Sequence, residues 1–229
     1  MNEEKEKCYW CGKPEEGIEH VPPQNLFPKG YREQLITVPA CRKHNQDFSK
    51  IDERIRIHLI DMSADSEIAR NHFSNKIIRG LKREQSRGLA IDILSNKFTD
   101  TDGKKYNRER AINFDLYFEK IIRGIFYNHY KTNFNGSTHF FSNRMQMIHL
   151  SANAHFYYYN IEKDYSDYWI EGNPKNKKVF DYKYHYSTKE DRFYVIMKFY
   201  ENLTVTGTSL PIGKTIDDFS LSMDEYLKK

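Results

Sequence analysis

The sequence predicts an α+β protein, and three observations lead to that prediction. Apolar residues recur at helical spacing in several stretches between residues 42 and 131. From residue 138 onward, short aromatic runs alternate with clusters of Asn, Gly and Pro, which is typical of a mostly antiparallel β region. Ahead of both, residues 8–44 contain all three cysteines of the chain, which indicates a small metal-stabilised unit.

The helical stretches follow in chain order. Residues 42–62 place Phe48, Ile51, Ile55 and Leu59 three or four apart, and residues 66–81 repeat the pattern. Residues 87–98 fit either a short helix or a strand. Residues 108–131 have a broad apolar stripe and are expected to form a core helix.

The second half of the chain is expected to form short strands. Val, Ile, Tyr and Phe dominate these runs, and turn-forming residues separate them. We expect strands at residues 139–141, 148–150, 156–159, 179–182, 193–200 and 203–207, and a short helix that starts at residues 222–225. The aromatic side chains of this region either form an ordinary sheet core or provide a surface on which bases stack.

Composition indicates a soluble protein. Charged residues make up 30% of the 229 residues, the mean hydropathy is −0.83, and the net charge is +4. No apolar run approaches the roughly 20 residues of a membrane-spanning helix, and Met1 to Lys5 lack the apolar core of a signal peptide. The lack of such a run leads us to expect no membrane partner, and three cysteines that bind a metal would fit a reducing cytoplasm.

Two residue pairs have the spacing of a closed zinc site. Cys8 and Cys11 form a C-x2-C pair, and Cys41 with His44 forms a C-x2-H pair. Each pair can place two donors on one tetrahedral Zn²⁺, and Gly12 suits the sharp turn that follows Cys11. The alternative is that Cys41 is an ordinary buried thiol and that His44 faces solvent on a helix.

A second group of residues lies around these pairs. Glu19 and His20 lie between the two pairs, and Asn45 follows His44 directly. Together with the four cysteine and histidine positions, this order resembles the zinc-stabilised HNH (ββα-metal) endonuclease family. The resemblance covers roughly the first quarter of the chain. It implies an HNH nuclease module with structural zinc at residues 1–62, followed by an α+β region at residues 63–229 for substrate contacts, sensing or partner binding.

The resemblance also implies roles for individual residues. His20 would be the general base that activates water, and Glu19 with Asn45 would hold a catalytic Mg²⁺ or Mn²⁺. Asp52 or Glu53 would be an extra ligand of that ion, in the place where many family members have His or Lys. The alternative is structural: Glu19 and His20 form a polar turn, and Asn45 satisfies backbone donors at a helix start.

A basic stretch follows the metal segment. Arg79, Lys82, Arg83 and Arg87 are expected either to track the phosphates of a nucleic acid or to form a solvated helix face. The resemblance implies a metal-dependent endonuclease whose expected substrate is DNA rather than RNA, in phage defence or restriction, with a homodimer or a defence-system protein as partner. The alternatives are a non-catalytic zinc-knuckle module that binds nucleic acid or protein, and a nuclease gated by a partner or ligand.

Overall fold

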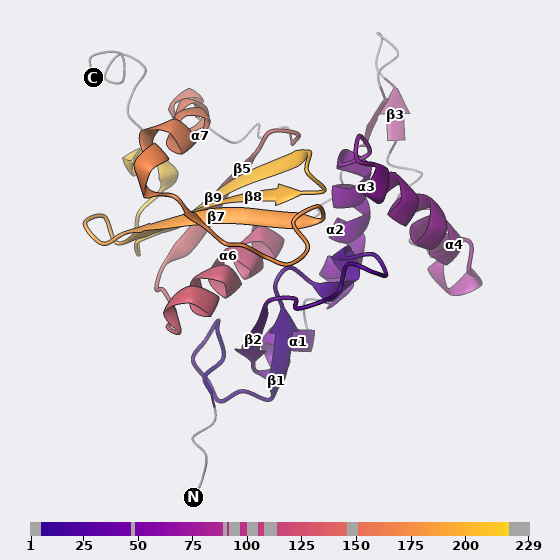
Figure 1. Cartoon of the computed structure of the whole chain (residues 1–229), viewed down its shortest axis with the longest axis horizontal. Helices are drawn as coiled ribbons and strands as arrows, with labels where there is room; N and C mark the ends of the chain where they lie inside the picture. Colours follow the sequence, from indigo (N-terminus) through magenta and orange to yellow (C-terminus); the bar gives the residue numbers. More distant parts are fainter. Residues whose placement is uncertain are drawn as a thin grey trace, which may run out of the picture.

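The protein has a mixed α+β fold with antiparallel strands, as the sequence predicts (Figure 1). The computed structural model describes residues 6–46, 49–88, 91, 97–99, 105–107, 114–145 and 151–219. The expected strand at residues 148–150 and the expected helix start at residues 222–225 lie outside these ranges. None of the helices in this part of the chain is long and apolar enough to cross a membrane.

The N-terminal part is a hairpin followed by helices. Strand β1 (Gly17–His20) pairs antiparallel with β2 (Thr37–Ala40), and Glu19 lies opposite Val38. The connection contains a short 3₁₀ helix, η1 (Gln24–Leu26). Helix α1 (Arg42–Gln46) follows β2 directly, and α2 (Ser49–Met62) comes next. This agrees with the predicted helix at 42–62, apart from residues 47–48, which lie outside the described ranges.

A continuous helical run follows α2. It consists of α3 (Glu67–His72), the π-helical segment η2 (Phe73–Ile77) and α4 (Ile78–Leu81), and it confirms the helix predicted at 66–81. A 3₁₀ turn, η3 (Glu84–Ser86), comes after it. Beyond this, β3 (Lys97–Thr99) and β4 (Lys105–Asn107) form a separate antiparallel pair.

Helix α6 (Phe114–Tyr130) is the central helix of the fold. Most of its residues are buried, and it contacts α2 and β2 as well as strands of the large sheet. In Figure 1 it lies beneath the large sheet, on the side of the β1–β2 hairpin. The structure therefore confirms the predicted core helix from residue 114 onward, and residues 108–113 lie outside the described ranges.

The large sheet has five antiparallel strands in the order β5-β9-β8-β7-β6. Its strands are β5 (Ser137–Ser142), β6 (Ile170–Glu171), β7 (Phe180–Ser187), β8 (Arg192–Phe199) and β9 (Leu203–Leu210). Four of these agree in place with predicted strands. The sheet is rich in aromatic residues, and rings of β7 and β8 pack against rings of α6.

The predicted strand at residues 156–159 is wrong, because this stretch lies in helix α7 (Ala152–Asp164). The Ser151 hydroxyl caps the helix by accepting a hydrogen bond from the Ala154 amide at 3.1 Å. Ala154, Tyr158 and Ile161, at helical spacing, are the buried residues of α7. Burial of this face, together with the cap, outweighs the strand preference of the aromatic run. A 3₁₀ turn, η4 (Ser166–Tyr168), follows, and η5 (Ile216–Asp218) packs near α7.

Close backbone approaches fix α6 between the hairpin and the sheet. A Cβ added to Gly124 would lie 2.5 Å from a methyl carbon of Val21, which directly follows β1. On the other side, a Cβ on Gly207 of β9 would lie 2.5 Å from Ile122. Both distances are far below ordinary contact, so these two glycines allow α6 to pack closely on both partners. The N-terminal segment and the sheet thus share one hydrophobic core.

Candidate functional site

The first part of the candidate site is the tight turn that carries Cys8 and Cys11. The amide of Gly12 donates to the carbonyl of Cys8 at 2.9 Å, and the amide of Cys8 donates to the carbonyl of Lys13 at 2.8 Å. Gly12 has a φ of 68°, a left-handed conformation that favours glycine. The turn directs both thiols of the C-x2-C pair toward the start of α1.

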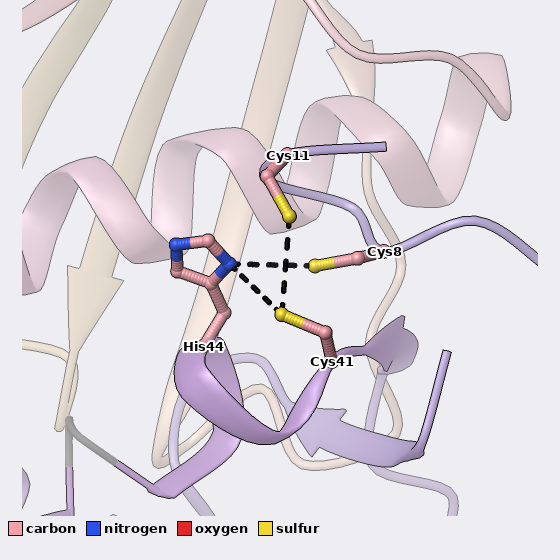
Figure 2. A group of neighbouring side chains, drawn as sticks. All are labelled: Cys8, Cys11, Cys41 and His44. Atoms are coloured by element: carbon pink, nitrogen blue, oxygen red, sulfur yellow. Dashed lines mark hydrogen bonds between the residues drawn. The ribbon is translucent and has the colours of Figure 1, made fainter. Parts of the chain in front are cut away.

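The four predicted zinc ligands converge on one point (Figure 2). Cys41 ends the approach to α1 and His44 lies one turn into it, so both donors come from the same short segment. Cys11 Sγ lies 3.8 Å from Cys41 Sγ, and His44 Nδ1 lies 3.6 Å from Cys8 Sγ and 3.3 Å from Cys41 Sγ. All four donor atoms lie within 4.8 Å of one another.

These distances fit a tetrahedral metal. With Zn–S bonds near 2.3 Å, two sulfurs of one tetrahedron are about 3.8 Å apart, which matches the Cys11–Cys41 separation. A disulfide would need about 2.05 Å. Within the described ranges, this is the one group of three or more Cys, His, Asp or Glu side chains that could hold a metal. The Cys₃His set therefore fits a structural zinc ion.

Three residues other than the four predicted ligands, Trp10, Arg123 and Asn133, hold this group against the rest of the fold. Trp10 stacks on the His44 ring with centroids 5.3 Å apart, and the Arg123 guanidinium of α6 lies 5.0 Å from the centre of a Trp10 ring. Asn133, in the loop after α6, donates from Nδ2 to the carbonyl of Cys8 at 3.1 Å and also to that of Tyr9. Nothing in the sequence marks Asn133, because its partners lie more than a hundred residues away.

The hairpin and α1 form a β-β-α unit around this cluster. His20 ends β1 and is half-buried, and the Asn45 side chain donates from Nδ2 to the carbonyl of Ile18 at 3.1 Å. Asn45 therefore fastens α1 to β1 close to His20. Burial lowers the pKa of His20 below its ordinary value of 6.5, and the positive charge of Lys120 lowers it further. His20 is consequently neutral at pH 7.

Glu19 points to the opposite face of β1, into the core. Its carboxylate Oε1 lies 3.0 Å from the Lys120 ammonium of α6, and Asp52 Oδ2 of α2 lies 2.7 Å from the same nitrogen. Lys120 is fully buried, and Glu19 and Asp52 are 7% and 6% exposed. Burial raises the pKa of both carboxyl groups, although Lys120 acts in the opposite direction. We call these three side chains the buried triad.

The buried triad affects the expected site of the catalytic ion. Two of the expected ion ligands, Glu19 and Asp52, do come together, but they meet around an ammonium group. A catalytic Mg²⁺ or Mn²⁺ does not fit Glu19 in this conformation, because the carboxylate is buried and already paired. Asn45 contacts the backbone of β1 through its amide nitrogen, and this hydrogen bond does not engage the amide oxygen that was expected to bind the ion. Glu53 is largely exposed and lies 3.7 Å from Arg56, outside the triad.

Sequence reasoning missed Lys120. Its signal is a single lysine between Phe118 and Ile121 in the apolar stripe of the core helix. Such a lysine needs buried acidic partners, which could have been sought on the hairpin and on α2.

The predicted basic stretch lies at the surface. The side chains of Arg79, Lys82, Arg83 and Arg87 are exposed on or just after α4. Arg83 lines a small cavity together with Arg56 and Lys76. These positions leave the choice between phosphate contacts and a solvated face open.

The chain was compared with protein-family models, curated proteins and solved structures. No protein-family model matches the chain, and neither a curated protein nor a solved structure does.

Proposed function

We propose that residues 8–46 form a zinc-stabilised nuclease module of the HNH type that hydrolyses phosphodiester bonds of nucleic acid, with DNA rather than RNA as the expected substrate. The observation that supports this proposal is the joint arrangement of the Cys₃His cluster, the β-β-α unit and the adjacent His20 and Asn45. Each motif alone is common. The HNH resemblance implies that all of them occur in one unit and in this order along the chain.

In the proposed chemistry, His20 takes a proton from the attacking water. The lowered pKa keeps its imidazole neutral near pH 7, which is the form a general base needs. Asn45 positions the end of β1 through its hydrogen bond to Ile18. Zinc contributes no chemistry in this scheme. A zinc ion held by Cys8, Cys11, Cys41 and His44 would join the Cys8–Cys11 turn to α1 and so keep His20 and Asn45 in one rigid unit.

Plasmid cleavage tests the proposal. Supercoiled plasmid is incubated with wild type, His20→Ala and His155→Ala in Mg²⁺, Mn²⁺ or EDTA, and zinc is measured in each preparation. His155 of α7 serves as the matched control, because it lies outside the module. We expect cleavage by wild type and the control, and its loss in His20→Ala with about one zinc per chain still bound. Equal cleavage by all three proteins would refute the role of His20.

The buried triad favours a second candidate, a nuclease that is inactive in the observed conformation. The Lys120 ammonium forms an ion pair with the Glu19 carboxylate, which a catalytic divalent ion would need as a ligand. Binding of that ion would then need a change that moves α6 away from β1. A partner protein or a ligand that acts on α6 or on the sheet could supply this change, because α6 contacts both the hairpin and the sheet.

A double variant separates the two candidates. Asp52→Asn with Lys120→Met removes the competing ammonium and leaves Glu19 as the one charge of the triad. If the nuclease is gated, this variant cleaves plasmid with Mg²⁺ or Mn²⁺ under conditions in which wild type does not. Adding His20→Ala to it should abolish the gain. If wild type and the double variant are both inactive but still bind nucleic acid in a gel-shift assay, the result would instead favour a non-catalytic zinc-knuckle module.

A further inference from the structure

A cavity outside the zinc module lies between the loop after η1 and the α3–η2 helical run. Its volume is about 420 Å³, within the usual range of small-molecule sites. Lys29 and Tyr31 line it from the loop. On the helical side, Asn71, His72, Asn75 and Lys76 line it, so two side-chain pairs four residues apart face the same space. We call this the loop–helix cavity.

The helix changes its hydrogen bonding at this cavity. The π-helical segment η2 begins at Phe73, directly after His72, and it includes Asn75 and Lys76. Such segments are rare and are found frequently at functional sites, because they displace side chains from the regular helical positions.

The surroundings of the cavity are positively charged. Lys29 and Lys76 line it, and none of the described lining residues is acidic. Burial first, and then the positive charges of Arg56, Lys76 and Arg32, lower the pKa of His72 to about 4. Lys76 has a lowered pKa for the same reasons, burial first and then Arg32 and Arg56. Cations held this close together favour an anionic ligand.

His72 lines the cavity in a defined hydrogen-bonding state. The Tyr200 hydroxyl donates its single hydrogen to the carbonyl of Leu26, so it must accept from His72 Nδ1, 3.0 Å away. A neutral imidazole has one N–H group, which leaves Nε2 as an acceptor. Nε2 has no hydrogen-bond partner among the described residues, and His72 is 4% exposed. Because Nε2 itself is almost completely buried, a ligand in the cavity would reach it only if neighbouring side chains moved.

We propose that the loop–helix cavity binds a nucleotide, with its phosphate at Lys29 and Lys76 and its base between Tyr31 and the two asparagines. A phosphate dianion alone would satisfy the cations, but it would leave most of the cavity empty. A nucleotide adds amino or hydroxyl donors and a flat ring that can stack on Tyr31. Asn71 and Asn75 offer both donors and acceptors to a base edge.

Binding of four probes to the full zinc-loaded chain tests this proposal by calorimetry: adenosine 5′-monophosphate, adenosine, pyrophosphate and a single-stranded oligonucleotide. We expect the mononucleotide to bind more tightly than adenosine or pyrophosphate. Lys76→Gln should weaken nucleotide binding by about ten- to hundredfold, the usual effect of a lost charge-assisted hydrogen bond. Lys198→Gln, at an exposed lysine of β8, should leave it unchanged.

The oligonucleotide distinguishes a free nucleotide from one unit of a strand. Tighter binding of the oligonucleotide, with the same loss in Lys76→Gln, assigns the cavity to a nucleic acid strand. Weaker binding assigns it to a free nucleotide. The proposal is overturned if pyrophosphate binds as tightly as the nucleotide, if no probe binds at millimolar concentration, or if Lys76→Gln behaves like Lys198→Gln. Lys76 and Lys198 are both exposed, so we expect thermal unfolding to show that neither substitution affects folding.

Discussion

Replacing Lys120 by Met tests whether the buried triad holds the hairpin, α2 and α6 together. The methionine keeps an apolar stem of similar length but leaves Glu19 and Asp52 without their counter-ion. Removing one partner of a buried ion pair costs about 3–5 kcal/mol. For a chain of this size that corresponds to a fall of roughly 6–20 °C in the unfolding temperature.

Proton uptake limits this loss and makes it depend on pH. Protonating Glu19 from its ordinary pKa of 4.5 takes about 3 kcal/mol at pH 7 but less than about 1 kcal/mol at pH 5. For Asp52, with an ordinary pKa of 3.8, the values are about 4 and about 2 kcal/mol. Both folded pKa values are raised, so the folded state holds protons more tightly than the unfolded state. The two carboxyls therefore favour folding at low pH, and this effect fades as pH rises from their ordinary values through the raised ones.

Urea unfolding at pH 7 and pH 5 measures the effect. We expect Lys120→Met to lose about 3–5 kcal/mol at pH 7 and clearly less at pH 5. The triple variant with Glu19→Gln and Asp52→Asn should recover most of the loss, because no charge is then stranded. Lys198→Met, at an exposed site, should stay within about 0.5 kcal/mol of wild type. A Lys120→Met protein within about 1 kcal/mol of wild type at pH 7 would show that the reasoning is wrong.

Three further predictions concern the metal, the proposed base and the packing of α6. Cys11→Ser should lower the zinc content well below one ion per chain, and a chelator should lower the unfolding temperature of wild type far more than that of this variant. If His20 is the base, cleavage should fall as pH drops through a midpoint below 6.5, because burial and Lys120 lower its pKa; a midpoint well above 6.5 in the pH–rate profile would contradict this. Gly124→Ala should destabilise by about 1–3 kcal/mol through its clash with Val21, whereas Gly80→Ala, with open space around it, should stabilise by up to about 1 kcal/mol in the same denaturant titration.

The parts of the structure that the sequence predicts are those that depend on local spacing. The four zinc donors lie in two short turns, and the spacing within each turn already fixes how two donors are placed. The helix at 114–130 and the strands at 192–199 and 203–210 carry strong apolar patterns over many residues. Residues 156–159 misled the prediction because strand preference is weak beside a capped, buried helix face.

The parts that could not be predicted depend on contacts between distant residues. Lys120 contacts Asp52, which lies 68 positions earlier in the sequence. No local pattern therefore reveals that Glu19 pairs with this ammonium group and does not face an open metal site. The loop–helix cavity is similar. Burial and then the charges of Arg56, Lys76 and Arg32 lower the pKa of His72, and its hydrogen-bond partner Tyr200 lies 128 positions away. Such groupings arise only when the chain has folded.

The anchoring of the zinc turn by Asn133 has a consequence for synthesis of the chain. Asn133 lies 125 residues after Cys8, whose carbonyl it binds. At about 5–20 residues per second, a ribosome adds Asn133 roughly 6–25 s after Cys8. All four residues of the Cys₃His group exist long before that moment, so an ion bound there would close the turn on a nascent chain that still lacks α6. Zinc supply during translation would then determine whether α6 meets a preformed hairpin or a disordered one.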